Sequence, residues 1–196
     1  MKKTCLTLLA ASALPAFAAL DIASVDIENV KLGLNNDEAA AAVQTYCTAK
    51  KGRYNKLQKD SRDTHICLDS EKNLLFVVLL NNKVVNVMHV QNITLDNQEQ
   101  DASNKWQQTM RDKIINQYGE PALDANKVVF IQEDKPIDLP QNTLCWGDCE
   151  EQSKEPNKKF LMTKSKALLI SFGTIKDKTA VIRILNDATN MPAAQK

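Results

Sequence analysis

Cysteines are the residues of this 196-residue chain whose type and spacing suggest the most definite chemistry. Cys5 lies in an N-terminal segment that we expect to be removed, which leaves Cys47, Cys67, Cys145 and Cys149. An even number of cysteines in an exported chain predicts disulfides rather than free thiols. Pairing neighbours in sequence predicts the bonds Cys47–Cys67 and Cys145–Cys149. The first would close a loop of about twenty residues and contribute roughly 3 kcal/mol in the chain-entropy model.

The pair Cys145 and Cys149 has two other interpretations. One is a redox pair, although redox motifs usually separate their thiols by two residues at a helix N-terminus, and here three residues intervene. The other is a zinc site completed by Cys67 and His65, but an oxidising compartment disfavours thiolate ligands. We therefore expect structural disulfides, with no metal and no cofactor.

Histidine and serine chemistry has little support in the sequence. The only two histidines, His65 and His89, lie in expected strands, and we expect isolated strand histidines to be surface or rim residues. No Gly-x-Ser-x-Gly motif occurs, and the carboxylates match no calcium-binding loop. The sequence therefore predicts no catalytic residue.

Trp146, Gly147 and Asp148 lie between the last two cysteines, in an expected tight loop. Gly147 would let the chain turn closely enough to join the two sulfurs. An indole held in an exposed loop is a typical anchor of a protein interface, so these three residues are our candidate contact site. The alternative is that Trp146 folds back onto the sheet.

The segment after the first expected helix is rich in basic residues. Together with Tyr54, it could contact anionic lipid or an acidic partner. Asp60 and Asp63 dilute its charge, so we expect a solvated linker, with such a contact as the alternative. The basic residues are Lys50, Lys51, Arg53, Lys56, Lys59 and Arg62.

Helices and strands must position these residues, and the periodicity predicts the same arrangement twice. In the first unit, Asn35 and Glu38 form a candidate capping box for a helix that runs to about Lys50. Strands are expected at 63–68, 73–80 and 83–91. Asn81 and Asn82 would join the last two strands in a tight turn, because Asn tolerates positive φ.

The second unit also begins with a helix. Ser103 is the candidate N-cap, Trp106 and Met110 begin an apolar stripe, and Gly119 is the expected stop. Strands are expected at 127–132, 142–146, 159–163, 166–175 and 178–185, with loops at 133–141 and 150–158.

We therefore predict an α+β fold in which a helix packs on an antiparallel sheet, duplicated as two helix-then-strands units. The units would span 19–98 and 99–196, or form one continuous domain. Two apolar hairpins, residues 73–92 and 167–187, resemble each other and favour duplication. Chance similarity between two hydrophobic hairpins is the alternative.

Residues 1–18 have the pattern of a secretory signal peptide. Two lysines precede an apolar stretch over residues 4–14, Pro15 ends it, and Ala16 and Ala18 fit a small-x-small cleavage site. We expect cleavage after Ala18 and a periplasmic or secreted protein. The apolar stretch is too short to span a membrane, and no later segment is longer, so we expect no transmembrane segment in the mature chain.

The composition narrows the class of function further. Apolar residues make up 43% of the chain, enough to bury a core, so disorder is not expected. The 25 basic and 24 acidic side chains give a net charge of +1. A dedicated nucleic-acid binder needs a basic excess, so we expect no nucleic-acid partner.

The segment Asn29-Val30-Lys31-Leu32-Gly33-Leu34-Asn35-Asn36-Asp37-Glu38-Ala39 resembles the helix start of small bacterial envelope modules. These include the outer-membrane-assembly lipoprotein of the SmpA type and the β-lactamase-inhibitor-protein fold. The resemblance implies helices packed on an antiparallel sheet and a function in binding proteins. Leu34 stands where those modules usually have Met, and the lipoprotein cysteine is absent, so the resemblance assigns no functional residue.

We therefore expect an exported, non-catalytic envelope protein that acts as a protein-binding or inhibitor-like module. Its protein partner would lie in the cell envelope, and its contact surface would be the Trp146 loop and the exposed sheet face. The alternatives are a thiol–disulfide or other periplasmic enzyme, and a carrier of a small apolar ligand.

Overall fold

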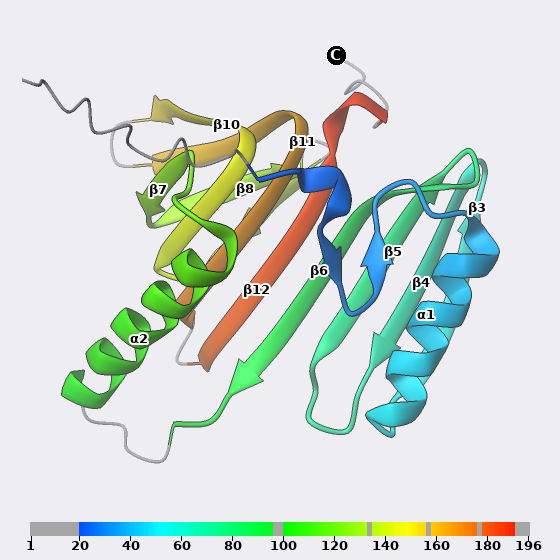
Figure 1. Cartoon of the computed structure of the whole chain (residues 1–196), viewed down its shortest axis with the longest axis horizontal. Helices are drawn as coiled ribbons and strands as arrows, with labels where there is room; N and C mark the ends of the chain where they lie inside the picture. Colours follow the sequence, from blue (N-terminus) through cyan, green and yellow to red (C-terminus); the bar gives the residue numbers. More distant parts are fainter. Residues whose placement is uncertain (1–19, 96–99, 133–134, 156–157, 176–177, 191–196) are drawn as a thin grey trace, which may run out of the picture.

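The structure is a computed structural model that describes residues 20–95, 100–132, 135–155, 158–175 and 178–190 (Figure 1). The expected signal peptide lies outside these residues, so its cleavage stays a prediction. Long strands make up most of the described chain, and two α-helices lie against the sheet that the strands build.

The described elements follow one another in a simple order along the chain. The helical elements are η1 (Ile22–Ser24), α1 (Asn36–Ala49), α2 (Gln100–Tyr118) and η2 (Ala188–Asn190). The strands are β1 (Asp26–Ile27), β2 (Val30–Lys31), β3 (Arg53–Lys59), β4 (Arg62–Leu68), β5 (Leu74–Leu80), β6 (Lys83–Ile93), β7 (Leu123–Asn126), β8 (Val128–Gln132), β9 (Lys135–Asp138), β10 (Asn142–Glu155), β11 (Lys158–Ile175) and β12 (Lys178–Asp187).

One mixed sheet contains all the described strands that follow the small β1–β2 hairpin. Its main path runs β3-β4-β5-β6-β12-β11-β10-β7, and every pairing along that path is antiparallel. β8 instead pairs with β11 in parallel and carries β9 beside it. β6 and β12 are neighbours in the middle of the path, so one sheet joins the chain on both sides of residue 98.

The predicted fold class, α+β with duplicated helix-then-strands units, is wrong. The structure is mostly β, with 55% strand and 25% helix, and its ten-stranded sheet is mixed rather than antiparallel. Residues 133–141 and 150–158, expected as loops, contribute β9 and the end of β10 to this sheet. The two similar apolar hairpins both form central strands of this sheet. Central strands of a sheet that has a layer on each face carry apolar residues on both faces, which explains the similarity of the two hairpins.

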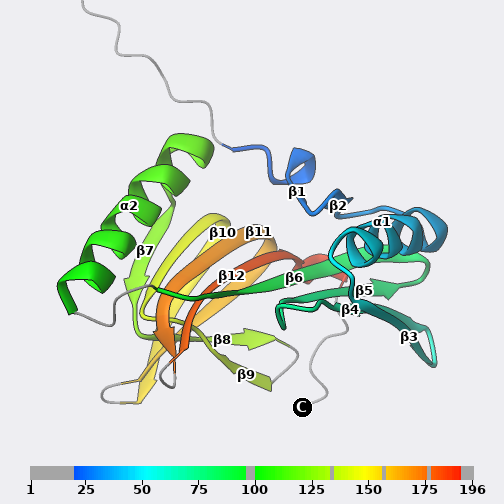
Figure 2. The same ribbon diagram turned by 90° about the horizontal axis from the view of Figure 1, so that it is seen from below.

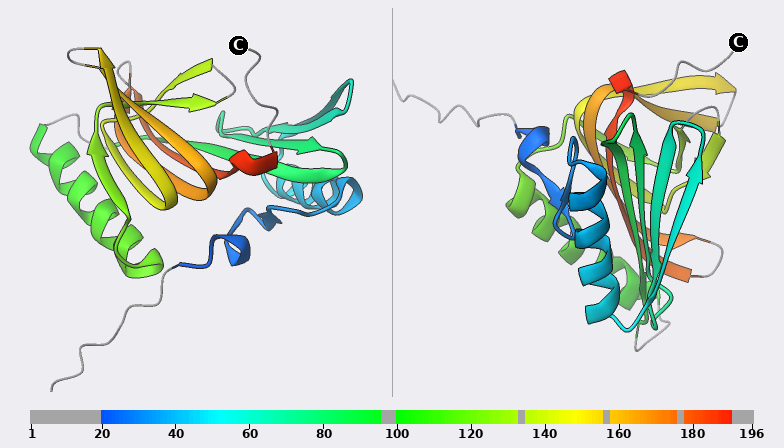
Figure 3. Two further views of the ribbon diagram at one scale, coloured as in Figure 1. Left: turned by 90° about the horizontal axis from the view of Figure 1, so that it is seen from above. Right: turned by 90° about the vertical axis from the view of Figure 1, so that its right-hand side faces the viewer.

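The sheet has a different cover on each face. Figure 2 shows α1 and α2 on one side of the sheet and the β8–β9 hairpin on the other, and the two views of Figure 3 agree. One core cluster lies under the helices and includes Val43, Val77 and Leu168. A second cluster lies between β8 and the central strands and includes Phe130 and Ile184.

Local signals in the sequence predict the ends of several elements. Asn35 Oδ1 accepts from the backbone N–H groups of Asp37 and Glu38, each at 3.0 Å, and Glu38 Oε2 accepts from the Asn35 N–H at 3.0 Å, which confirms the capping box. Asn81 and Asn82 both have positive φ, at 49° and 62°, and confirm the tight turn between β5 and β6.

Candidate functional site

Both predicted disulfides are present. Cys47 of α1 bonds to Cys67 of β4 with the Cα atoms 5.6 Å apart, and Cys145 bonds to Cys149 within β10 with the Cα atoms 6.3 Å apart. Cys47, Cys67 and Cys145 are buried, and Cys149 is half-buried. These bonds fit an oxidising location, and burial keeps thiolates in solution away from three of the four sulfurs.

The candidate contact site at Trp146, Gly147 and Asp148 does not form an exposed loop. These residues belong to β10, and Trp146 is only 3% exposed. Its Nε1 donates to the Gly119 carbonyl at 3.1 Å, and its ring lies 5.6 Å from the ring of Tyr118. The expectation of an exposed indole is therefore wrong, because the strand turns Trp146 toward the core under α2.

The remaining two residues of that site serve the local geometry of β10. Gly147 has φ +91°, and a Cβ there would collide with the Lys166 carbonyl oxygen, so the position requires glycine. The pairing of β10 with β11 shifts register between Gly147 and Cys149, which makes a bulge that the short disulfide closes. Asp148 is exposed, but the predicted interface also needed an exposed aromatic side chain, and Trp146 is buried.

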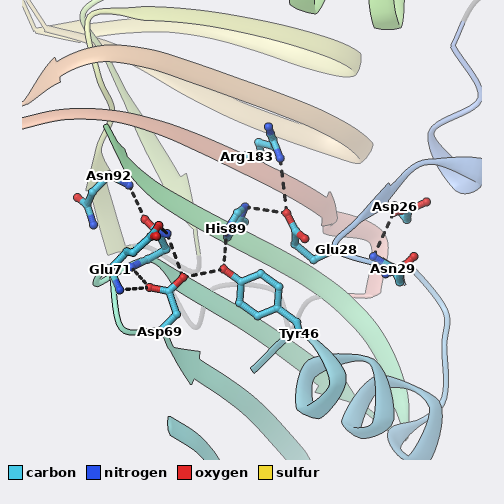
Figure 4. Close-up of polar contacts among 10 residues, drawn as sticks. Asp26, Glu28, Asn29, Tyr46, Asp69, Glu71, His89, Asn92 and Arg183 are labelled. Atoms are coloured by element: carbon cyan, nitrogen blue, oxygen red, sulfur yellow. Dashed lines mark hydrogen bonds and ion pairs between the residues drawn. The ribbon is translucent and has the colours of Figure 1, made fainter. Parts of the chain in front are cut away.

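A largely buried polar network joins Tyr46, His89 and Asp69, and the sequence did not reveal it (Figure 4). Tyr46 Oη, from α1, lies 3.1 Å from His89 Nε2 on β6 and donates to Asp69 Oδ2 at 3.3 Å. Glu28, in the β1–β2 turn, places Oε1 3.5 Å from His89 Nδ1 and 3.8 Å from Arg183 on β12. The network thus joins the N-terminal hairpin, helix α1 and the sheet.

Asp69 anchors one end of this network. Its Oδ1 accepts from the backbone N–H groups of Glu71 and Asn73, at 2.9 and 2.8 Å. Its Oδ2 accepts from Asn73 Nδ2 at 3.0 Å and from Tyr46, so all four contacts stabilise the carboxylate. Asn73 in turn accepts from the Asn92 N–H at 2.8 Å, which ties the β4–β5 turn to β6.

The protonation states follow from these contacts. The Tyr46 hydroxyl donates to Asp69 and lies 3.1 Å from His89 Nε2, whereas His89 Nδ1 faces Glu28 Oε1 at 3.5 Å and forms no hydrogen bond with the described residues. Burial, with Arg183 adding to it, lowers the pKa of His89 to about 4. Burial, together with the nearby charges of Asp69 and Glu28, raises the pKa of Tyr46.

His65 belongs to a second buried polar group. Its Nδ1 lies 2.7 Å from Tyr54 Oη, and its Nε2 lies 2.9 Å from the side-chain amide of Asn36, whose nitrogen also reaches Asp63 when it faces Nε2. Burial and the charge of Lys56 lower the pKa of His65. The expectation that both histidines are surface or rim residues is therefore wrong, because His65 and His89 are 0% and 4% exposed.

These networks are better suited to holding elements together than to acid–base catalysis. At neutral pH Tyr46 keeps its proton and His89 is uncharged, and both are buried. A general acid or base must reach a substrate within hydrogen-bond distance, which burial opposes. One signal in the sequence could have indicated part of the network. Asp69 and Asn73 lie in a turn between two strands, and this spacing is typical of an Asx-type turn.

An uncovered apolar surface lies on the other face of the sheet. The pairs Leu68↔Leu74 and Ile66↔Phe76 stand in register on β4 and β5, and Leu57 on β3 lies on the same face, opposite Thr64 and diagonal to Ile66. Leu57 and Leu68 are 51% and 47% exposed, and the other three apolar side chains are half-buried. We call this surface, formed by Leu57, Ile66, Leu68, Leu74 and Phe76, the outer apolar face.

The layer of β8 and β9 covers only part of this side of the sheet. Met88 and Val90 of β6 pack against the second core cluster, and β3, β4 and β5 lie beyond it. A groove of about 1050 Å³ continues the outer apolar face past the β4–β5 turn. Leu68, Leu74 and Val90 line it together with Lys72 and Lys178.

Within the described residues, no group of three or more His, Cys, Asp or Glu side chains is placed to hold a metal ion. No helix in the described parts of the chain is long and apolar enough to cross a membrane. Comparisons with protein-family models, with curated proteins and with solved structures each find no match to this chain. The proposed function therefore depends on the chemistry of the chain's own residues.

Removal of the buried indole should cost stability. We expect Trp146→Ala to lower the free energy of unfolding by about 3–5 kcal/mol, because a large buried side chain and its hydrogen bond to Gly119 are lost. Asp148→Ala, at an exposed position of the same strand, should change it by less than about 0.5 kcal/mol. Urea unfolding followed by circular dichroism measures both; equal midpoints would contradict the buried position of Trp146.

Acidification should weaken the fold through His89. Its pKa is about 4 in the folded chain against 6.5 as the ordinary value, so the unfolded chain binds more protons between these pH values. The stability that neutral His89 provides is complete above pH 6.5 and is lost as the pH falls toward 4, by about 3 kcal/mol.

Urea titrations between pH 4 and 7 test this. His89→Gln should reduce the pH dependence that the native chain shows in this window, and His65→Gln, at a second buried histidine whose pKa is also lowered, should reduce it separately. Parallel pH profiles of the native chain and His89→Gln would show that His89 is not buried in its neutral form.

Proposed function

We propose that this chain is an exported, non-catalytic envelope protein that acts as a protein-binding or inhibitor-like module through its outer apolar face. The observation that carries the proposal is the exposure of Leu57 and Leu68, on the same face of the sheet as the half-buried Ile66, Leu74 and Phe76. Contiguous exposed apolar side chains on a folded protein are typical of interaction sites.

The chemistry of the interior supports binding rather than catalysis. The two disulfides use all four cysteines outside the N-terminal segment, and Cys145 of the Cys145–Cys149 bond is buried. A buried sulfur disfavours a thiol–disulfide enzyme. The buried histidines and Tyr46 are uncharged at neutral pH and bond to neighbouring side chains. The resemblance of residues 29–39 to envelope modules that bind proteins favours the same class of function.

The proposed location is the periplasm or the external medium. The disulfides fit such an oxidising location, and residues 1–18 have the signal-peptide pattern. Export with cleavage after Ala18 would leave a mature chain that begins at Ala19.

The cleavage site can be tested directly. Intact-mass measurement of the exported protein should give the mass of residues 19–196 with two disulfides, and Ala18→Leu should leave the segment attached because the site requires a small residue there. A mature protein that still carries residues 1–18 in the native chain would contradict the proposed signal peptide.

The binding surface can be tested by affinity capture from the native envelope after crosslinking in cells. Leu57→Thr combined with Leu68→Thr should reduce partner capture by about tenfold, because two exposed apolar anchors are removed while strand-forming residues are kept. Gln58→Thr is the matched control, since Gln58 is exposed on the same strand but faces the other side.

Three outcomes of this experiment are informative. One stoichiometric partner, lost in the double variant and retained in the control, supports the proposal. Equal capture by all three proteins removes the outer apolar face from the site. A bound small molecule in native mass spectra, with no protein partner, would favour the apolar-ligand carrier instead.

A further inference from the structure

Strand β3 forms one edge of the ten-stranded sheet. It pairs with β4 on one side and has no strand partner on the other within the described chain (Figure 1). Six of its seven residues are exposed, Tyr54 being half-buried. In an antiparallel ladder every second residue of an edge strand directs its N–H and C=O groups outward, so β3 offers a row of open backbone groups.

The side chains of β3 give this edge a positive charge. Arg53 and Lys59 lie at the two ends of the strand, on the same face as Leu57, and form no ion pair with any described residue. Lys56 faces the side of the helices, where its Nζ lies 3.8 Å from Asp63. An apolar side chain between two cations therefore stands directly beside the open backbone edge.

We propose that β3 accepts an extended acidic segment of the partner protein as an additional antiparallel strand. The inference rests on the proposed function and names the partner chemistry that the surface fits. The added strand would gain backbone hydrogen bonds from the open edge, and its apolar side chain would pack against Leu57 and extend the outer apolar face. Its acidic side chains would stand opposite Arg53 and Lys59.

The same charges argue against a second copy of this chain as the occupant. Antiparallel self-pairing centred on Lys56 would place Lys56 opposite Lys56 and Arg53 opposite Lys59. Like charges directly opposite each other destabilise a pair of strands, and basic residues on edge strands commonly prevent such association. The basic side chains of β3 thus disfavour pairing with β3 of a second copy and favour a strand that carries carboxylates.

The register defines a peptide probe. Running antiparallel to β3, a seven-residue segment needs an acidic residue at each end, opposite Lys59 and Arg53, and an apolar residue third, opposite Leu57. The synthetic peptide Glu-Thr-Leu-Thr-Thr-Thr-Glu, with blocked ends, meets these requirements. A matched peptide with Lys in place of both Glu residues is the control.

We expect the acidic peptide to bind the mature protein and to slow hydrogen exchange at alternate amides of β3, since strand addition protects outward N–H groups. Arg53→Glu combined with Lys59→Glu should weaken this binding by about tenfold and should favour the lysine peptide instead. Lys105→Glu combined with Lys113→Glu changes the net charge equally but lies on exposed positions of α2, and should leave binding unchanged.

Each contrary outcome overturns a defined part of the proposal. No protection of β3 amides by the acidic peptide overturns strand addition, and equal weakening by the α2 variant shows a general charge effect instead. Partner capture from the envelope that survives Arg53→Glu with Lys59→Glu but not Leu57→Thr with Leu68→Thr overturns strand addition while the proposed function stands. Absence of any captured partner for the native chain overturns the proposed function itself.

Discussion

The antiparallel pairing of β6 with β12 is the contact on which the rest of the structure depends. Asn86 and Asn186, 100 positions apart, face each other in this pairing and share a buried hydrogen bond of 3.1 Å. Buried amides are costly unless they are bonded, so this pair and the 2.7 Å bond from Asn186 to Thr163 favour one register. A slip of either strand by one residue would also turn Val87 or Leu185, whichever lies on the strand that moves, away from the core.

That register determines where the polar interior can form. His89 stands opposite Arg183 across β6 and β12, and Glu28 reaches both of them from the β1–β2 turn. Tyr46 of α1 then contacts both His89 and Asp69, which lies in the turn between β4 and β5. Five separate segments, the β1–β2 turn, α1, the β4–β5 turn, β6 and β12, are thus held by one connected set of polar contacts.

Local signals predicted much of this structure, and long-range context decided the rest. The capping box at Asn35, the turn at Asn81 and Asn82, and both disulfides depend on near neighbours in sequence, and all are present. β3 resembled a solvated linker because an edge strand with exposed side chains carries no apolar alternation. Trp146, the last residue of an expected strand, resembled part of an exposed loop because the pairing of β10 with β11, which continues the strand, involves residues distant in sequence. His89 is likewise buried by elements distant in sequence.

The two faces of the sheet are covered to different extents, and this difference explains why the outer apolar face is exposed. The helices cover one face of the sheet, whereas β8 and β9 cover the other face only as far as β6. The reason is that β8 pairs in parallel with residues 159–161, near the start of β11. Extension of that second layer over β3, β4 and β5 would bury Leu57 and Leu68 and would stabilise the fold by the hydrophobic effect. The chain instead leaves them exposed beside a charged edge that disfavours self-association, a combination that favours selective contact with another protein over simple stability.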